Sequence, residues 1–242
     1  MSKALLKIEG LRAWYGAAQI LFDLNFAVGR GEVVALMGRN GAGKSTTMKT
    51  IMGLIGQRDG VVRFNGENIS RLKPFENARR GLGFTPEDRR IFSDLTVMEN
   101  LDIGRQPARA FPDGAPAPVW TPQRLFALFP NLAEMPNRPG GRMSGGEQQM
   151  LTVARTLMGN PLLVLLDEPS EGVAPLIVEQ MANTIVALKE QGLSILLSEQ
   201  NIHFAQLVAD RVYVLEKGQI RWHGTMAELS GNEDVQRAYL TV

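Results

Sequence analysis

The 242-residue sequence contains no cysteine and only two histidines. The absence of cysteine excludes disulfide bonds and metal sites built on thiolates, and it permits a reducing compartment without proving one. The two histidines, His203 and His223, stand alone in the chain and do not make a metal site. We expect both at the surface.

Long apolar runs and an excess of one charge are also missing. No apolar stretch approaches the length of a membrane-spanning helix, and the N-terminus lacks the basic-then-apolar order of a signal peptide. The formal net charge of +1 gives no reason to expect nucleic acid as a partner. We therefore expect a soluble, cytosolic protein unless a partner holds it at a membrane. The length fits one large α/β domain or a domain with a subdomain.

Strand and turn patterns dominate the first part of the chain. Residues 5–8 begin a strand, and residues 29–32 look like a chain reversal into the apolar run 33–37. Residues 61–64 followed by Asn65-Gly66 indicate a strand with a hairpin turn. These segments predict an antiparallel sheet beside the core.

Three later runs are short, apolar and uninterrupted, which is typical of parallel strands covered on both faces. They are residues 162–166, 195–197 and 212–215, and residues 177–188 between them read as a crossover helix. The segment from about 95 to 159 is mostly helical in pattern. Prolines, a glycine and several alanines interrupt it at residues 105–120, which we predict to be a surface loop.

The strongest motif lies at residues 38–45, which match G-x-x-x-x-G-K-[ST] at every fixed position. Glycines permit backbone angles that direct amide groups at phosphate oxygens, Lys44 adds a positive charge, and Ser45 offers a hydroxyl to Mg²⁺. The alternative is a glycine-rich turn with a chance lysine. The apolar strand before the motif and the helix-like residues 46–52 after it argue for a phosphate-binding loop.

Two acids follow the apolar run 162–166. Asp167 at the end of a buried strand would reach Mg²⁺ through its water shell, and Glu168 would orient and deprotonate the attacking water. The alternative is a pair of acids that merely end a strand at solvent. Their combination with Lys44 favours the catalytic interpretation.

A second anion-binding signal begins at Ser144. The sequence Ser144-Gly145-Gly146-Glu147-Gln148 opens a segment whose apolar positions recur at helical spacing, so exposed amides would lie at a helix N-terminus. Taken alone, the same residues could be only a helix cap.

Together, the phosphate loop, the residues 143–149 and the Asp167-Glu168-Pro169 run resemble the ATP-binding cassette (ABC) subunits of transporters over essentially the whole chain. The sequence is most similar to the smaller ATPase subunit of bacterial branched-chain amino acid importers, with urea importers next. The resemblance implies a P-loop NTPase (RecA-like) α/β fold. Residues 1–90 and 160–242 would form the core with an antiparallel β subdomain, and residues 91–159 an inserted α-helical signature subdomain.

The resemblance also implies an ATPase that uses ATP and Mg²⁺ and works as a head-to-tail dimer. The second ABC subunit would be a paralogue, and integral membrane permease subunits and a periplasmic binding protein would complete an importer. The chain would then lie peripherally on the cytoplasmic side of the inner membrane. Each signature motif would cover ATP held by the partner's phosphate loop.

The resemblance assigns residues to three roles. The implied catalytic residues are Glu168, Lys44 and Gln200, and the implied Mg²⁺ residues are Ser45, Glu87 and Asp167. The implied ATP contacts are Tyr15, Gly38, Arg39, Asn40, Gly41, Ala42, Gly43, Lys44, Ser45, Thr46, Ser144, Gly145, Gly146 and Glu147.

Several of these positions depart from the usual family pattern. Gln200 stands where the family has a γ-phosphate histidine, and an amide can donate to phosphate but cannot carry an imidazolium charge. Glu87 stands where most cassettes have glutamine, and residues 170–173 differ from the common wording of the segment that crosses the dimer interface. Tyr15 matches the adenine-stacking aromatic; otherwise it is a half-buried strand aromatic.

Other functions remain open from sequence alone. A non-transport cassette ATPase acting on ribosomes or DNA would usually show two fused cassettes or a coiled-coil insertion, and neither is present. Gln200 also allows a non-catalytic regulatory subunit. Cargo contacts would lie in partner subunits, so the sequence does not identify the cargo, and urea or another small solute is an alternative to amino acids.

Overall fold

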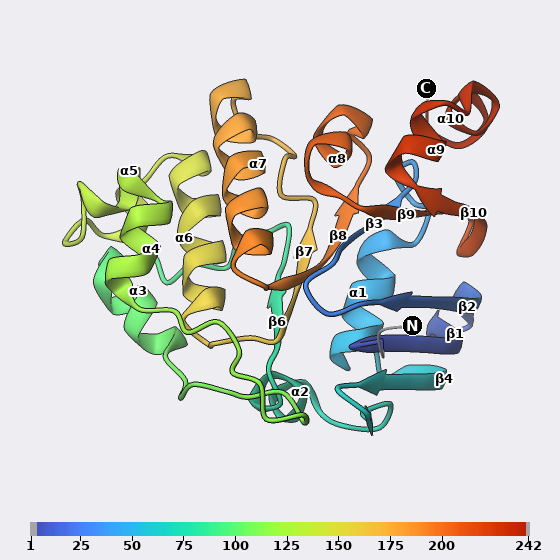
Figure 1. The fold of residues 1–242 in the computed structure, drawn as a ribbon, viewed down its shortest axis with the longest axis horizontal. Helices are drawn as coiled ribbons and strands as arrows, with labels where there is room; N and C mark the ends of the chain where they lie inside the picture. Colours follow the sequence, from blue (N-terminus) through green and yellow to red (C-terminus); the bar gives the residue numbers. More distant parts are fainter. Residues whose placement is uncertain (1–3, 241–242) are drawn as a thin grey trace.

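The structure is a computed structural model that describes residues 4–240. Two sheets and a set of helices make an α/β fold (Figure 1). The larger sheet has six strands in the order β10-β9-β3-β8-β7-β6, and the smaller has four in the order β2-β1-β4-β5. The expected α/β class is confirmed.

The larger sheet is parallel from β9 to β6, and β10 joins it antiparallel to β9. Its strands are β3 (Val33–Met37), β6 (Leu82–Thr85), β7 (Leu163–Asp167), β8 (Ser194–Glu199), β9 (Arg211–Glu216) and β10 (Gln219–Thr225). The three predicted apolar runs are β7, β8 and β9. The edge strands β6 and β10 were not predicted: β6 is short and contains Gly83, and β10 mixes exposed and half-buried residues.

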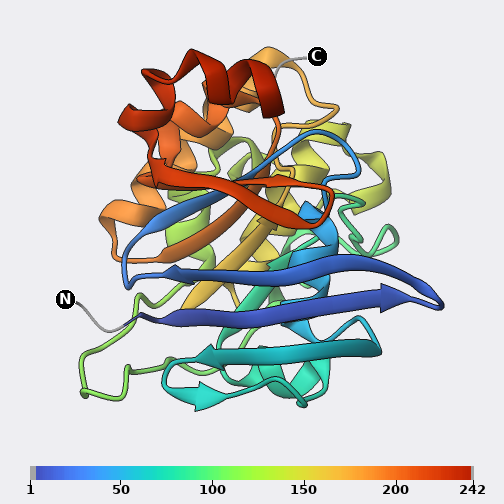
Figure 2. The same cartoon turned by 90° about the vertical axis from the view of Figure 1, so that its right-hand side faces the viewer.

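The smaller sheet is antiparallel, as predicted, and its strands lie side by side in Figure 2. It consists of β1 (Leu6–Tyr15), β2 (Ala18–Val28), β4 (Gln57–Phe64) and β5 (Glu67–Asn68). The Asn65-Gly66 turn between β4 and β5 has positive φ at both residues, as a type I′ hairpin turn requires.

The helices are α1 (Lys44–Met52), α2 (Pro74–Arg79), α3 (Val97–Gly104), α4 (Pro122–Leu128), α5 (Pro130–Ala133), α6 (Gly145–Leu157), α7 (Pro175–Glu190), α8 (Ile202–Val208), α9 (Met226–Ser230) and α10 (Glu233–Tyr239), with a 3₁₀ turn at Gly140–Arg142. Helices α1 and α3 to α7 lie in segments predicted to be helical, whereas α2, α8, α9 and α10 were not predicted. The predicted crossover helix is α7. Among residues 4–240, no helix combines the length and the apolar character needed to cross a bilayer.

The two faces of the larger sheet bury different partners. Val34 and Leu36 of β3 belong to an apolar cluster with α1 and the antiparallel sheet, whereas Val33 belongs to a cluster with α6, α7 and α8. The alternation follows from the two-residue repeat of a strand, which points successive side chains to opposite faces. Because β3, β8 and β7 are neighbouring parallel strands, their carboxyl ends meet at the same edge of the sheet.

The loop at residues 105–120 has no helix or named strand, as predicted, but it is not confined to the surface. Phe111, Ala117 and Trp120 are buried, and Phe111 and Ala117 join the cluster of the antiparallel sheet. The Arg30 guanidinium lies 3.5 Å from the centre of the Phe111 ring and pairs with Asp113. The expectation of a surface loop is thus wrong for these apolar residues, which link it to a distant part of the core.

The division into a core and a helical subdomain at residues 91–159 stays a prediction. Helices α3, α4 and α6 do pack together, yet their apolar cluster also contains residues of β7, β8 and α7. The helices and the sheet thus share one apolar core.

Candidate nucleotide-binding site

The phosphate loop connects the buried strand β3 to α1. Gly38 has φ 155 and Gly43, the N-cap of α1, has φ 106. A Cβ on Gly38 would lie 2.3 Å from the Leu215 carbonyl oxygen, so only glycine fits against β9 there. The loop therefore ends at a helix N-terminus, where free amides and the helix dipole favour an anion.

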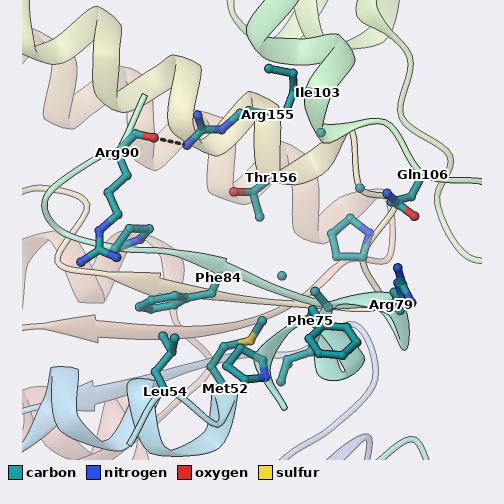
Figure 3. Close-up of a pocket in the computed structure, with 18 of the residues that line it drawn as sticks. Met52, Leu54, Phe75, Arg79, Phe84, Arg90, Ile103, Gln106, Arg155 and Thr156 are labelled. Atoms are coloured by element: carbon teal, nitrogen blue, oxygen red, sulfur yellow. Dashed lines mark hydrogen bonds between the residues drawn. The ribbon is translucent and has the colours of Figure 1, made fainter. Parts of the chain in front are cut away.

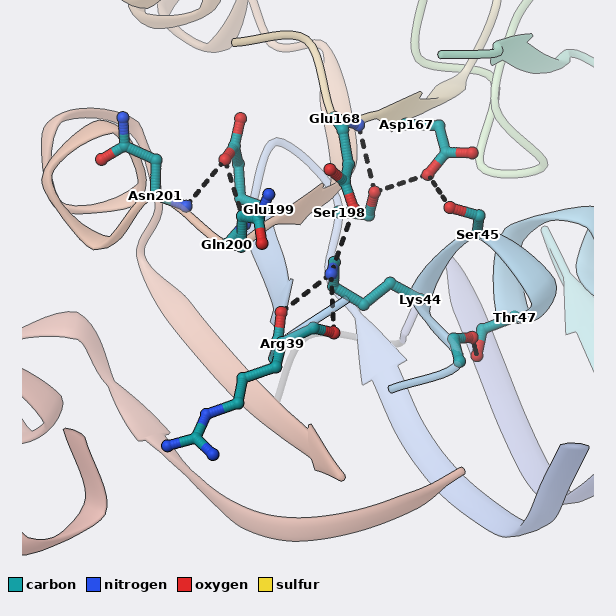
Figure 4. Close-up of polar contacts among 12 residues, drawn as sticks. Arg39, Lys44, Ser45, Thr47, Asp167, Glu168, Ser198, Glu199, Gln200 and Asn201 are labelled. Carbon is teal, nitrogen blue, oxygen red and sulfur yellow. Dashed lines mark hydrogen bonds and ion pairs between the residues drawn. The ribbon is translucent and has the colours of Figure 1, made fainter. Parts of the chain in front are cut away.

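Lys44, the first residue of α1, is buried and surrounded by oxygen atoms (Figure 4). Its Nζ lies 2.8 Å from the Gly38 carbonyl oxygen, 3.3 Å from that of Arg39 and 3.0 Å from Glu168 Oε1. The ammonium group is thus held at the phosphate loop by neutral acceptors and by one carboxylate. A phosphate oxygen has to compete with that carboxylate for the lysine.

Asp167 ends β7 and is also buried. Its Oδ1 accepts hydrogen bonds from Ser45 Oγ at 2.9 Å and from Ser198 Oγ at 2.6 Å. Its Oδ2 is buried without a hydrogen-bond partner, and burial raises the pKa of this carboxyl against the effect of the two serines. An unpartnered carboxylate oxygen beside a serine hydroxyl fits Mg²⁺, which protein sites bind through one or two oxygen ligands plus substrate phosphates.

Glu168 follows Asp167 in a left-handed backbone conformation, with φ 47. Its N–H donates to the carbonyl oxygen and to the hydroxyl of Ser198, both at 3.1 Å, so β8 holds the residue in this strained state. Such conformations persist where surrounding contacts enforce them, often at functional sites. Burial raises the pKa of Glu168, but a hydrogen bond from Glu171 and the Lys44 charge outweigh it and lower the pKa.

Two further acids, Glu171 and Glu87, lie near Glu168. The pKa of Glu171 is raised to about 7, because its carboxyl hydrogen-bonds Glu168, is partly desolvated, and lies near the charges of Glu168 and Glu87. Neither Glu171 nor Ser198 was predicted as a site residue. The sequence offered only a weak signal for them, namely their closeness to Glu168 and Gln200 along the chain.

A cavity of about 470 Å³ opens between the phosphate loop and these acids. Its lining residues are Tyr15, Ile20, Asn40, Gly41, Ala42, Gly43, Lys44, Ser45, Thr46, Glu87, Glu168 and Glu171. The structure thus brings Tyr15 and Glu87 to the phosphate loop from distant parts of the sequence. Tyr15 is 50% exposed at the end of β1, so its ring is open for stacking.

The signature residues lie elsewhere. Within the described part of the chain, Ser144 and its three followers are not among the residues lining this cavity. Ser144 is the exposed N-cap of α6: its Oγ accepts from the Glu147 N–H at 3.3 Å, and Glu147 Oε2 accepts from the Ser144 N–H at 2.7 Å. The helix-cap interpretation is confirmed as local geometry, and contact with a partner's ATP stays a prediction.

Gln200 was predicted to be a catalytic residue, and His203 and His223 were predicted to lie at the surface. Gln200 is half-buried after β8, and its N–H donates to Glu199 Oε2 at 3.1 Å. It is not among the cavity-lining residues. His203 on α8 and His223 on β10 are both exposed, as expected. Among residues 4–240, no three acids, histidines or cysteines cluster closely enough to hold a metal ion.

The sequence is similar to those of known proteins along most of its length. The profile of the ABC transporter family matches residues 21–171. The high-affinity branched-chain amino acid transport ATP-binding protein BraG of Pseudomonas aeruginosa is 42% identical, covering 98% of this chain and 99% of BraG. The lipopolysaccharide export system ATP-binding protein LptB of Haemophilus influenzae is 34% identical, covering 98% and 97%.

A solved structure has a similar fold. The ADP conformation of MJ1267, an ATP-binding cassette of an ABC transporter, superposes with a TM-score of 0.78 at 27% identity, covering 95% of this chain and 94% of MJ1267. Sequence and fold agree with the phosphate loop and the two acids at the ends of β3 and β7. The chain belongs to the ABC transporter family and is one of its ATPases.

Proposed function

We propose that this ATPase binds ATP with Mg²⁺ between its own phosphate loop and the signature residues of a second ABC subunit. Lys44 and the loop amides would hold the β and γ phosphates, and Ser45 and Asp167 would hold Mg²⁺. The ion would neutralise charge on the phosphates. The exposed position of Ser144, away from the chain's own cavity, supports a contact with the partner's nucleotide.

Glu168 is the proposed general base. Its lowered pKa keeps it ionised near neutral pH, and it lines the cavity beside the phosphate loop. It would take a proton from the water that attacks the γ-phosphorus, releasing phosphate and ADP. Gln200 would donate an amide hydrogen to the γ-phosphate where the family has histidine. The second subunit would then be a paralogue that keeps the histidine.

The proposed task of this cycle is the uptake of branched-chain amino acids. The observation that carries it is the 42% identity to BraG along nearly the whole chain. Permease subunits in the membrane and a periplasmic binding protein would supply the cargo path. The chain would bind the cytoplasmic side of the permeases, and closing and reopening of the ATPase dimer would drive their alternating access.

An apolar groove of about 600 Å³ is the proposed contact with a permease (Figure 3). Leu54, Phe75, Phe92 and Ile103 line it, and each is about half exposed. Pro86 and Arg90 also line it, and Glu87, between them in the chain, lines the ATP cavity. A short cytoplasmic helix of the permease with an apolar face would fill the groove, and residues 86–90 would relay its movement to the ATP site.

The groove can be tested with two charged variants. Phe75→Asp and Ile103→Asp should abolish copurification with the permease while ATP binding by the isolated chain persists. Leu207→Asp, on α8 and 64% exposed outside the groove, is the matched control and should copurify normally. Retention of the permease by both groove variants would contradict this docking site.

Lipopolysaccharide export is the second candidate, because LptB matches 98% of the chain at 34% identity. The two functions differ in direction and in the chemistry of the cargo. We would coexpress the chain with its neighbouring membrane subunits, reconstitute the complex in vesicles and measure phosphate release. Stimulation by a binding protein loaded with leucine, isoleucine or valine supports import. Stimulation by lipopolysaccharide alone would overturn it.

A further inference from the structure

A buried carboxylate that has no assigned role lies behind the proposed hydrolytic site. Glu199 is the last residue of β8 and is 1% exposed. Its Oε1 accepts hydrogen bonds from Ser170 N–H at 3.2 Å and from Ser170 Oγ at 2.5 Å. Its Oε2 accepts from the N–H groups of Gln200 at 3.1 Å and Asn201 at 3.0 Å (Figure 4).

The two oxygens of Glu199 therefore serve two different chain segments. One holds the segment that leaves β7 with Asp167 and Glu168, and the other holds the segment that leaves β8 with Gln200. Both segments lie at the carboxyl ends of neighbouring parallel strands. The single Glu199 side chain thus hydrogen-bonds both Ser170 and Gln200.

The preceding residue strengthens the same connection. Ser198 donates its hydroxyl to Asp167 Oδ1 at 2.6 Å and accepts the Glu168 N–H at 3.1 Å. Ser198 and Glu199 thus hold Asp167, Glu168 and Ser170, three residues within one four-residue stretch. The strained φ of Glu168 requires such external support.

Burying a carboxylate is costly unless its oxygens are well hydrogen-bonded. The pKa of Glu199 is raised above its ordinary value, because burial outweighs the hydrogen bonds from Ser170 and Asn201 that lower it. Four donors satisfy both oxygens, and all four belong to the two segments. An apolar side chain could fill this buried position without the free-energy cost of desolvating a carboxylate.

We propose that Glu199 is a positioning residue for ATP hydrolysis, whose carboxylate fixes the segment bearing Glu168 relative to the segment bearing Gln200. The inference rests on the proposed roles of those two residues. Glu199 itself does not line the ATP cavity, and neither does Ser170. It would act by keeping base and amide at a fixed separation around the γ-phosphate, and small misplacements of such groups are expensive in rate.

Glutamine at position 199 tests the acceptor role with little change in shape. One oxygen becomes an NH₂ group, which meets N–H donors on either side and cannot accept from them. At least one segment is then released. We expect kcat to fall about tenfold to a hundredfold in Glu199→Gln, with the KM for ATP changed less than about twofold because the phosphate contacts remain.

Ser170→Ala provides a second, milder probe. It removes one donor to Oε1 and should lower kcat by a smaller factor. Glu199→Gln and Ser170→Ala both disrupt the same contact between Glu199 and Ser170. The fall in kcat of the double variant should therefore be smaller than the product of the two single falls. If Glu199→Gln does not fold, Ser170→Ala alone still tests the connection through its kcat-to-KM split.

Ser194→Ala is the matched control at the other end of β8. Ser194 is buried and its hydroxyl accepts the Gly31 N–H at 2.9 Å, so the variant also loses a buried hydrogen bond from this strand. It should lower the melting temperature without lowering kcat. Phosphate release by the complex of this chain with its second ABC subunit, at saturating ATP and Mg²⁺, is the assay.

Glu168→Gln, measured in parallel, separates two failures. If it is inactive while Glu199→Gln and Ser170→Ala retain parental kcat, the positioning role is wrong and the base assignment stands. If Glu168→Gln itself retains turnover, the base assignment is wrong. If Ser194→Ala loses as much kcat as Glu199→Gln for the same fall in melting temperature, the proposal is also overturned.

Discussion

Replacing Glu168 with glutamine should have two opposite effects, because this carboxylate both faces the proposed reacting water and pairs with Lys44. Loss of the general base should lower kcat by about a hundredfold or more, which corresponds to about 2.7 kcal/mol of transition-state stabilisation. Loss of the ion pair should release Lys44 for the phosphates. ATP should therefore bind the isolated chain more tightly even as hydrolysis slows.

The size of the binding effect follows from the ion-pair geometry. Lys44 Nζ and Glu168 Oε1 are 3.0 Å apart, and two unit charges at that distance attract by about 5.5 kcal/mol at an effective dielectric constant of 20. Desolvation offsets most of this energy. Glutamine keeps an oxygen for Lys44, and the Gly38 and Arg39 carbonyls remain. We expect a net gain of about 1–2 kcal/mol, or roughly 5- to 30-fold in ATP affinity.

Calorimetric titration of the isolated chain with ATP and EDTA measures this gain. Leaving out Mg²⁺ removes any change in metal binding from the comparison. Glu87→Gln is the matched control, because it removes a different cavity-lining carboxylate and leaves the ion pair between Lys44 and Glu168 in place. Equal gains in both variants would attribute the effect to general charge. Unchanged or weaker ATP binding by Glu168→Gln would refute the competition between carboxylate and phosphate.

The remaining predictions concern the phosphate loop, the signature residues, pH and subunit pairing. Lys44→Ala should weaken ATP binding by the isolated chain together with hydrolysis, whereas Ser144→Arg should spare that binding and block hydrolysis in the dimer; equal loss of monomer affinity would contradict the contact across the dimer. The Glu171 pKa is raised from an ordinary 4.5 to about 7, so the folded chain binds more protons than the unfolded chain between these values and its stability should fall as pH rises across that window. Melting curves from pH 4 to 8 should show a flatter dependence for Glu171→Gln, and parallel curves would exclude this linkage. Mass measurement of the assembled transporter should find one copy of this chain and one paralogue, a result that two copies of this chain would rule out. In that complex, Gln200→His should alter hydrolysis only at the site that uses this chain's Lys44, as labelled-nucleotide trapping can determine.

Local sequence determined the parts of the site whose residues are consecutive. Residues 38–45 specify a strand, a glycine turn and a helix N-terminus within one short stretch, so the phosphate loop was predictable from its own pattern. Asp167 and Glu168 were predictable for the same reason, since an apolar strand ends directly at them. Resemblance, in turn, supplied Tyr15, Glu87 and Gln200. The structure brings Tyr15 and Glu87 to the cavity and places Gln200 outside its lining.

Only the tertiary structure decided which groups meet across the sheet edge. The order β3-β8-β7 brings Lys44 to Glu168 and places Ser198 and Glu199 against residues 167–170. No local period or spacing encodes these contacts, because they depend on strand order and register. Likewise, Phe111 reads as part of a proline-rich loop, yet it is buried beside Arg30. Burial of a single side chain depends on what the rest of the chain packs against it, and sequence pattern alone does not contain that information.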